Sequence, residues 1–529
     1  MQDAAARCEA QAATRAVRDR LSQLPDDILL NISRGALHGI YLRTRMNYNM
    51  SINAMRNAVA RGEAEAAARE AARDRLGELP NHILLDILER LDTLDALRTC
   101  ILSKRMLQLP AMLSRFDIDI RSLRQHHNKA SHGHLNTTHR ARYNNALAGV
   151  TEKIMRARSP EIQIIHKLRV RCYLRPDECL PITRAFANTM ATQKVNNAEF
   201  VLLVEKKFSK CTHEDLVCYA KRFNTCLGDC PAAFAGLTHL WLRKMRFGEL
   251  DIPNILDTCK RLEHLRLTFC DAGICSVLLV EHDQLVELNV EGSQFEKVHL
   301  HRVPKLQRLT CGGWCSRVPL AFGYVPQLSM LNLIGRGFSS TTNLELSQLL
   351  STFPSLRELH LDFRSEKIWV VPECPKLLAP VLGKLESVNL ENLREGCDIA
   401  WTSFILEAAP RLRELCITVW DHWCNMVTGE DTLRERGFCK KASVEWQPSA
   451  SGLKHKNLVK LTIHGFQTDE NMVRYVRRIM EVTVNIGEIS LHDRKACQRC
   501  GDLDPGIKVL IIQSLCLYCL LVERLYSYY

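Results

Sequence analysis

The chain has 529 residues, of which 46% are hydrophobic and 25% charged, with a formal net charge of +12. These fractions are those of folded globular proteins, which excludes disorder throughout, and the length allows two or three domains or one domain with a long repeat array. Residues 1–20 are Ala-rich, mixed in charge and without a continuous apolar block, so we expect no signal peptide. We therefore expect a cytoplasmic or nuclear protein whose 22 cysteines are reduced and mostly buried.

The first 73 residues are rich in Ala and Arg and contain one half of a repeated motif. The stretch "RDRLSQLPDDILLNIS" at residues 18–33 aligns with "RDRLGELPNHILLDIL" at residues 73–88 at an offset of 55. The earlier copy continues as "RGALHGIYLRTRM" and never reaches the Leu-Ser-Lys-Arg that follows the later one. We therefore interpret residues 1–73 as an N-terminal segment with a degenerate, partial copy of the element that comes next.

Residues 74–120 predict three short helices. Pro80 suits the first turn of the first helix, Asp92 or Thr93 can cap the second, and a third would begin near Ser103. Apolar residues recur through the first two helices at helical spacing, and they are Ile83, Leu84, Ile87, Leu88, Leu91, Leu94, Leu97 and Ile101. Three helices of this size bury too little apolar area to be stable alone, so we expect them to pack against a partner.

The same segment resembles the F-box, in the plant form that reads Leu-Pro near its start and Leu-Ser-Lys-Arg near its end. The stretches "LPNHILLDILERL" and "ALRTCILSKR" carry the resemblance. It implies that the helices dock onto a Skp-type adaptor and, through it, a cullin–RING ubiquitin ligase. By position, it assigns adaptor contact to Leu79, Pro80, Ile83, Leu84, Ile87, Leu97, Ile101, Leu102 and Ser103. Met106 stands where the plant pattern usually has Trp, and Met fills irregular apolar gaps well.

A basic, His-containing segment follows at residues 121–160. Between residues 121 and 175 there are twelve Lys or Arg residues against only Glu152 and Glu161. The five histidines between residues 126 and 139 lack regular metal-ligand spacing. We interpret residues 121–160 as a solvated linker, and a nucleic-acid-binding arm or an import signal is the alternative.

The body of the chain repeats the pattern Leu-x-x-Leu-x-Leu. Successive motifs lie 21–29 residues apart, as in leucine-rich repeats, and one interval of 46 would hold two units. The motifs begin at Leu237, Leu262, Leu285, Leu306, Leu328, Leu356, Leu385, Leu412, Leu458 and Ile486. Weaker units occur at "IHKLRV" (165–170) and "FVLLV" (200–204). Because one unit cannot close a core alone, residues 161–505 should stack into one solenoid.

We therefore predict an α/β fold in which a three-helix F-box precedes a leucine-rich-repeat solenoid, or horseshoe, with a parallel sheet on its concave face. The position three residues after the last leucine, usually Asn or Cys, is Cys270 in one unit but Trp314, Arg336 and Arg364 in others. That departure predicts an irregular arc.

The whole sequence resembles the grass family of F-box proteins with leucine-rich repeats. Among the segments that carry this resemblance are "FGELDIPNILDTCKRLEHLRL" and "LEAAPRLRELCITVWDHWCNM", and it spans residues 74–505. It implies a non-catalytic substrate-recognition subunit of an SCF-type ubiquitin ligase whose repeats bind a target protein. Residues 506–529 form a divergent apolar tail, in which the apolar run Val509–Val522 is too short to span a membrane.

The x positions of the repeats point away from the core and are the candidates for target binding. Over the nine Leu-started units these positions hold five basic and five acidic residues, which suits a protein partner better than nucleic acid. The candidate residues are His239, Trp241, His264, Arg266, Arg308, Arg357, His360 and Arg413. Three alternatives stay open: a small-molecule sensor, for which the strands show no compact basic or aromatic cluster, a ligase-independent scaffold, and nucleic-acid binding through the basic linker.

Two patterns in the sequence suggest chemistry without supporting it. The pairs Cys497-x-x-Cys500 and Cys516-x-x-Cys519 have a zinc-type spacing, but the second pair lies inside the apolar run. We therefore predict ordinary thiols, no metal and no cofactor. The sequence contains no phosphate loop, no His-Glu-x-x-His and no glycine-flanked nucleophilic serine, so no catalytic residue is assigned.

Overall fold

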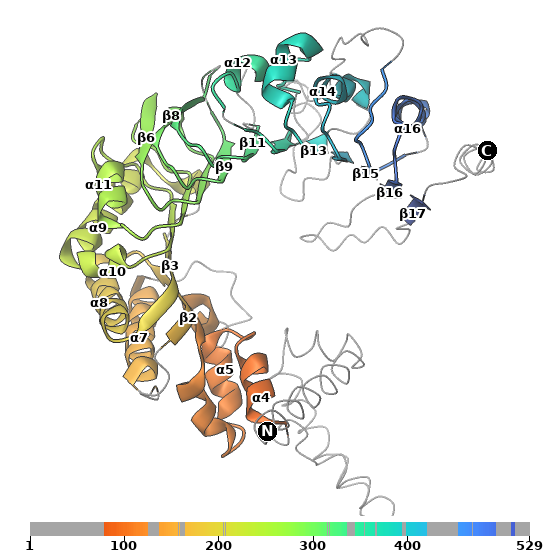
Figure 1. Cartoon of the computed structure of the whole chain (residues 1–529). Coiled ribbons are helices and arrows are strands. Elements are labelled where there is room, and N and C mark those ends of the chain that lie inside the picture. The colour runs from red at the N-terminus through yellow and green to blue at the C-terminus, as the bar shows by residue number, and fades with distance from the viewer. Residues whose placement is uncertain are drawn as a thin grey trace, which may run out of the picture. The chain divides into compact units, whose positions relative to one another are not determined.

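The computed structural model describes residues 79–513 with internal gaps (Figure 1). The gaps are residues 125–136, 157, 159–163, 205, 207, 274, 315, 317, 336–343, 354, 365–367, 394–397, 420–452, 468 and 493–508. The partial copy at residues 18–33, the four cysteines of the zinc-type pattern and the tail after residue 513 lie outside the described residues. The chain divides into a smaller compact unit, residues 1–129 with 153–163, and a larger one, residues 130–152 with 164–529.

The smaller unit is helical in its first half, as the sequence predicts. It contains the helices α4 (Asn81–Leu88) and α5 (Thr93–Cys100), the 3-10 helix η1 (Met106–Met112), the strand β1 (Arg115–Asp119) and the helix α6 (Ile120–Arg124). Asp92 caps α5, because its carboxylate accepts the backbone N–H groups of Leu94 and Asp95 at 3.0 and 3.1 Å. Burial raises the pKa of this carboxyl group to about 6. Ile101 is the C-cap of α5, so it lies at the end of the helix and not on its apolar stripe.

In the core of the smaller unit, η1 packs against α4 and α5. Leu84 is completely buried, and Met106 and Leu109 of η1 are only 2% and 1% exposed. Two hydrogen bonds anchor the segment that follows η1. The Glu89 carboxylate accepts the backbone N–H of Ser114 at 2.7 Å and its hydroxyl at 2.8 Å. Met106 therefore serves as a core residue at the position where the plant pattern has Trp.

Part of the predicted linker is a packed helix. The helix α7 (Thr137–Arg156) buries Leu147 and Asn144 one turn apart on the same face. The Asn144 amide donates to the carbonyl of Tyr173 at 2.9 Å and accepts its backbone N–H at 3.1 Å. These contacts fix α7 to the end of a strand of the larger unit, so the description of residues 121–160 as a solvated connector does not hold for this helix.

The larger unit contains the predicted parallel ladder. In spatial order its strands are β2 (Ile164–Tyr173), β3 (Lys194–Leu203), β4 (His239–Arg243), β5 (His264–Thr268), β7 (Glu287–Glu291), β9 (Arg308–Gly312), β11 (Met330–Ile334), β12 (Glu358–Asp362), β13 (Ser387–Leu393), β14 (Glu414–Val419), β15 (Lys460–His464), β16 (Glu488–His492) and β17 (Val509–Gln513). Every pairing from β2 to β16 is parallel and joins equivalent positions, so that Leu265, Leu288 and Leu309 form one buried row. Only β17 pairs antiparallel. The repeats and their strands are thus confirmed.

A second layer covers the buried face of this ladder, and its character depends on repeat length. The repeats spaced 25–29 residues contain helices between their described strands, whereas the three of 21–23 residues contain short strands. The helices are α8 (Pro176–Thr192), α9 (His213–Asp229), α10 (Pro231–Ala235), α11 (Asp251–Thr258), α12 (Leu346–Leu349), α13 (Pro375–Leu382), α14 (Ser403–Ala408) and α16 (Glu470–Val482), with the 3-10 helices η2 (Phe208–Lys210) and η3 (Ile399–Thr402). The strands β6 (Ser276–Glu281), β8 (Phe295–Arg302) and β10 (Leu320–Tyr324) form a separate parallel sheet in the order β10-β8-β6.

In Figure 1 the ladder lines the inner side of the larger unit and the helices lie on its outer side.

The interval of 46 residues does not contribute two strands to the ladder. Leu415 of β14 pairs directly with Leu461 of β15, so the expected second unit contributes no strand to the ladder between them, and residues 420–452 lie outside the described residues. No helix in the described part of the chain has both the length and the apolar character needed to cross a membrane.

Candidate functional site

The inner side of the ladder carries a continuous row of charged and aromatic side chains. Along β4 and β7, and through most of β5, buried and more exposed residues alternate, so that every second residue faces outward from the core. The parallel register then aligns Arg169, Glu199, His239, His264 and Glu287 across five neighbouring strands. We call this outward side of the ladder the open face.

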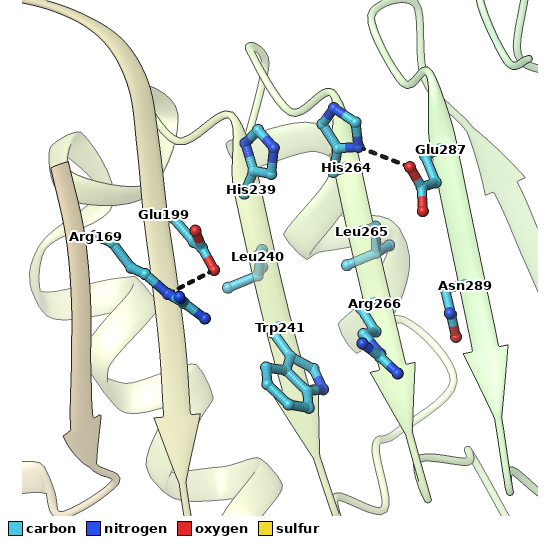
Figure 2. Close-up of a pocket in the computed structure, with 10 residues that line it drawn as sticks. All are labelled: Arg169, Glu199, His239, Leu240, Trp241, His264, Leu265, Arg266, Glu287 and Asn289. Atoms are coloured by element: carbon cyan, nitrogen blue, oxygen red, sulfur yellow. Dashed lines mark hydrogen bonds and ion pairs between the residues drawn. The ribbon is translucent and has the colours of Figure 1, made fainter. Parts of the chain in front are cut away.

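A hollow of about 410 Å³ lies on the open face over β2 to β7 (Figure 2). It is lined by Arg169, Glu199, His239, Leu240, Trp241, His264, Leu265, Arg266, Glu287 and Asn289. Four of the predicted target-binding residues, at positions 239, 241, 264 and 266, thus come together in it. We call this site the Trp241 hollow.

Two stacked histidines form one end of the Trp241 hollow. The rings of His239 and His264 lie 4.0 Å apart between centroids and are inclined by 17°. Burial, together with the proximity of His264 and Lys167, lowers the pKa of His239 to about 4. His239 is therefore neutral at pH 7, which avoids repulsion between two stacked imidazolium ions.

Glu287 joins the histidine pair to the next strand. Its carboxylate lies 3.2 Å from Nδ1 of His264 and 2.7 Å from a guanidinium nitrogen of Arg308. The hydrogen bonds from His264 and Arg308 lower the pKa of Glu287 to about 2. Arg308, another predicted candidate, therefore acts beside the hollow by holding Glu287 in place.

Trp241 and Arg266 line the other end of the Trp241 hollow, and Arg243 lies beside the Trp241 ring without lining the hollow. Its indole Nε1 donates to Oγ1 of Thr268 at 3.0 Å, which fixes the ring on the sheet. The guanidinium carbons of Arg243 and Arg266 lie 5.0 and 4.9 Å from the ring centroid, within the range of cation–π contact. Figure 2 shows Trp241 and Arg266 side by side on neighbouring strands. The expectation that the strands carry no compact basic or aromatic cluster is therefore wrong.

The remaining candidates lie on more distant strands. Arg357 directly precedes β12 and is ion-paired with Glu386 at 2.5 Å, His360 is on β12, and Arg413 directly precedes β14. Sequence reasoning did not select Arg169, Glu199 or Arg243. Arg169 and Glu199 belong to the weak early units. Arg243 stands one residue beyond the Leu-x-x-Leu-x-Leu motif, and because β4 extends to this residue it faces the same side as Trp241, two residues earlier.

Comparison with known families accounts for both units. A model of the F-box domain matches residues 76–117, and the model described as "At1g61320/AtMIF1, LRR domain" matches residues 202–514, which is more than half of the chain. The chain belongs to this leucine-rich-repeat family. It is an F-box and leucine-rich-repeat (F-box/LRR) protein, as the sequence resemblance implies.

Other comparisons add little to this assignment. No curated protein matches the F-box/LRR chain significantly. Among solved structures, one chain of the Drosophila Toll–Spatzle complex is 12% identical over 64% of this chain, with a TM-score of 0.20. The match spans about half, 53%, of that chain.

The F-box of the smaller unit presents an exposed apolar cluster. The side chains of Ile101, Leu102, Leu107 and Met112 are 71%, 55%, 55% and 38% exposed. Among the residues expected to contact the adaptor, Pro80 is also exposed, and Leu79, Ile87, Leu97 and Ser103 are partly exposed. Ile83 and Leu84 are 7% and 0% exposed because α4 turns them toward η1, so they can support this surface only from beneath.

Proposed function

We propose that the F-box/LRR protein is the substrate-recognition subunit of an SCF-type cullin–RING ubiquitin ligase. In this role the F-box binds a Skp-type adaptor and the open face of the repeats binds a target protein. The subunit forms no bond itself, and it accelerates ubiquitin transfer by raising the local concentration of the target near the ubiquitin-loaded enzyme.

The exposed cluster of Ile101, Leu102 and Leu107 carries this proposal. Large apolar side chains that stay exposed together at the end of one helix and the start of the next typify a protein interaction surface. They lie in the part of the chain that matches the F-box model, whose family role is adaptor docking. For the larger unit, the mixed charge around Trp241 favours a protein target, since Trp and Arg often anchor interfaces.

The test is co-purification of the full chain with a purified Skp-type adaptor. The double variant Ile101→Asp with Leu102→Asp is expected to lose the adaptor, because it places two charges in the contact while leaving the F-box core intact. Leu279→Asp is the matched control, since Leu279 is 44% exposed on the small sheet of the larger unit, and it should bind as the wild type does. Equal adaptor recovery with the double variant and the wild type would refute the docking surface.

A further inference from the structure

The acidic groups around Trp241 are all engaged by arginines of the open face. Glu199 pairs with Arg169 at 3.0 Å, and Glu291 pairs with Arg266 at 3.2 Å. Glu287 is held by Arg308, as described above. Lys167 adds a longer contact of 3.7 Å to Glu199. These pairs balance one another along the strands, so no carboxylate of this group is left to neutralise a further cation.

Arg243 is that further cation. No carboxylate lies within ion-pairing distance of it in the part of the chain that the structure describes. Its Nε is buried without a hydrogen-bond partner among the described residues. A buried guanidinium N–H without an acceptor is costly. Arg243 as a whole is partly exposed, so the outer N–H groups of its guanidinium can donate to an external acceptor, and a carboxylate fits their forked geometry.

A second guanidinium, that of Arg266, also contacts the Trp241 ring and adds to the positive charge beside Arg243. Arg243 opposes Thr268 in the register of β4 and β5, and Thr268 also accepts the indole N–H, which fixes the ring next to both arginines. Burial lowers the pKa of Arg243 and the neighbouring charge of Arg266 adds to the effect, so the environment already disfavours the bare cation. An anion bound by Arg243 near Arg266 would offset this excess of positive charge.

We infer that Arg243 and Arg266, placed on Trp241, bind a carboxylate. A single negative charge matches Arg243, which has no carboxylate partner among the described residues, and Glu291, which is bound to Arg266, would repel a doubly charged phosphate more strongly than a carboxylate. The adjoining Trp241 hollow of about 410 Å³ has room for more than a carboxylate, so it accommodates the residues that flank one in a chain.

The carboxylate comes from an acidic side chain in a segment of the target protein, an assignment that rests on the proposed function. A small organic acid offers the same chemistry and is the alternative source. The two are distinguished by separate probes in the experiment below.

The experiment follows Trp241 directly in the full chain labelled with 5-fluorotryptophan. The fluorine NMR signal of Trp241 is assigned as the one missing from Trp241→Phe. The peptide probe is acetyl-Gly-Leu-Glu-Leu-Gly-amide, compared with the same peptide carrying Gln, and the small-molecule probe is benzoate, compared with benzamide. We expect the Glu peptide to shift the Trp241 signal in a saturable way. The affinity of the Gln peptide should be lower by about tenfold or more.

Arg243→Gln is expected to weaken binding of the Glu peptide roughly tenfold or more, and Arg243→Lys to weaken it less because it keeps the charge but loses the fork. Arg302→Gln is the matched control, since Arg302 is exposed and paired with Asp283 on the small sheet of the same unit, and it should bind as the wild type does. A shift with benzoate and none with the peptide supports the carboxylate site and overturns the peptide as its source. No shift with either acid, or an equal shift with the Gln peptide, overturns the inference.

Adaptor co-purification with the same variants separates this inference from the proposed function. If Arg243→Gln and the wild type both retain the adaptor while no acid shifts Trp241, only the carboxylate site fails. If the Glu peptide binds through Arg243 while the wild type does not bind the adaptor, only the proposed ligase role fails.

Discussion

The buried histidine His239 predicts a loss of stability of the leucine-rich-repeat unit in mild acid. Burial lowers its pKa from the ordinary 6.5 to about 4, so between these values the unfolded chain binds a proton that the folded unit excludes. The stability of the unit is therefore unaffected by this group above about pH 6.5, and it falls as the pH decreases from 6.5 toward 4.

The size of the effect follows from the displacement of this pKa. A shift of the pKa from 6.5 to about 4 lowers the unfolding free energy by at most about 3.4 kcal/mol, a limit reached at pH values below both pKa values. Between pH 7 and pH 5 about 1.8 kcal/mol of this is lost, and partial exposure of the ring to solvent reduces the expectation to about 1 kcal/mol. The carboxylate of Glu287, with a pKa of about 2, contributes stability that is lost only as the pH falls below about 4.5, outside this interval.

Tryptophan fluorescence during urea unfolding isolates the unit, because all seven tryptophans lie at position 241 or beyond. His239→Gln should lose about 1 kcal/mol less unfolding free energy than the wild type between pH 7 and pH 5. His282 and His455 also have lowered pKa values owing to burial, and they contribute equally to both proteins, so only the difference is read. The same loss in wild type and variant would show that His239 is not held neutral by the fold.

Three further predictions concern packing and caps. Leu288→Ala should lower the unfolding free energy of the larger unit by about 2–5 kcal/mol, whereas Leu279→Ala, on the small sheet, should change it by less than about 0.5 kcal/mol, both measured by urea unfolding. Gly465 has φ +77° and a Cβ there would collide with the carbonyl of Val419, so Gly465→Ala should lower the thermal midpoint, and an equal midpoint would contradict the backbone geometry. Asp92→Ala should destabilise the F-box by about 0.5–2 kcal/mol, seen as faster hydrogen exchange in α5; unchanged exchange would rule out the cap.

The ladder was predictable because each strand repeats its own signal. Leu265, Leu288 and Leu309 occupy the same place in successive motifs, and stacking places them in one buried row. The second layer was harder to predict, since the residues between motifs follow no common pattern. The spacing of the motifs nevertheless contained the information. The repeats of 21–23 residues have short strands such as β6 in the second layer, and the repeats of 25–29 residues have helices there.

The site was predictable only in part, because side chains converge across strands and not along the sequence. His239, Trp241, His264 and Arg266 were found from their positions in the motif. Arg243 lies just after the motif, so the extent of β4 and the placement of the side chains were needed to show that it shares the Trp241 ring. In the F-box, the apolar stripe of α4 does not reveal which of its residues η1 covers. A single-sequence pattern identifies apolar residues and cannot tell a core contact from a contact with a partner.

The most direct test of the account compares proteins recovered with the full chain from cells in which the proteasome is inhibited. The baits are the wild type, Ile101→Asp with Leu102→Asp, and Arg243→Gln. The account predicts that the F-box variant loses the adaptor and cullin and keeps the target proteins, whereas Arg243→Gln keeps the adaptor and loses targets. Recovery of adaptor and cullin with the F-box variant at the wild-type level would contradict the central claim that this exposed apolar cluster joins the chain to the ligase.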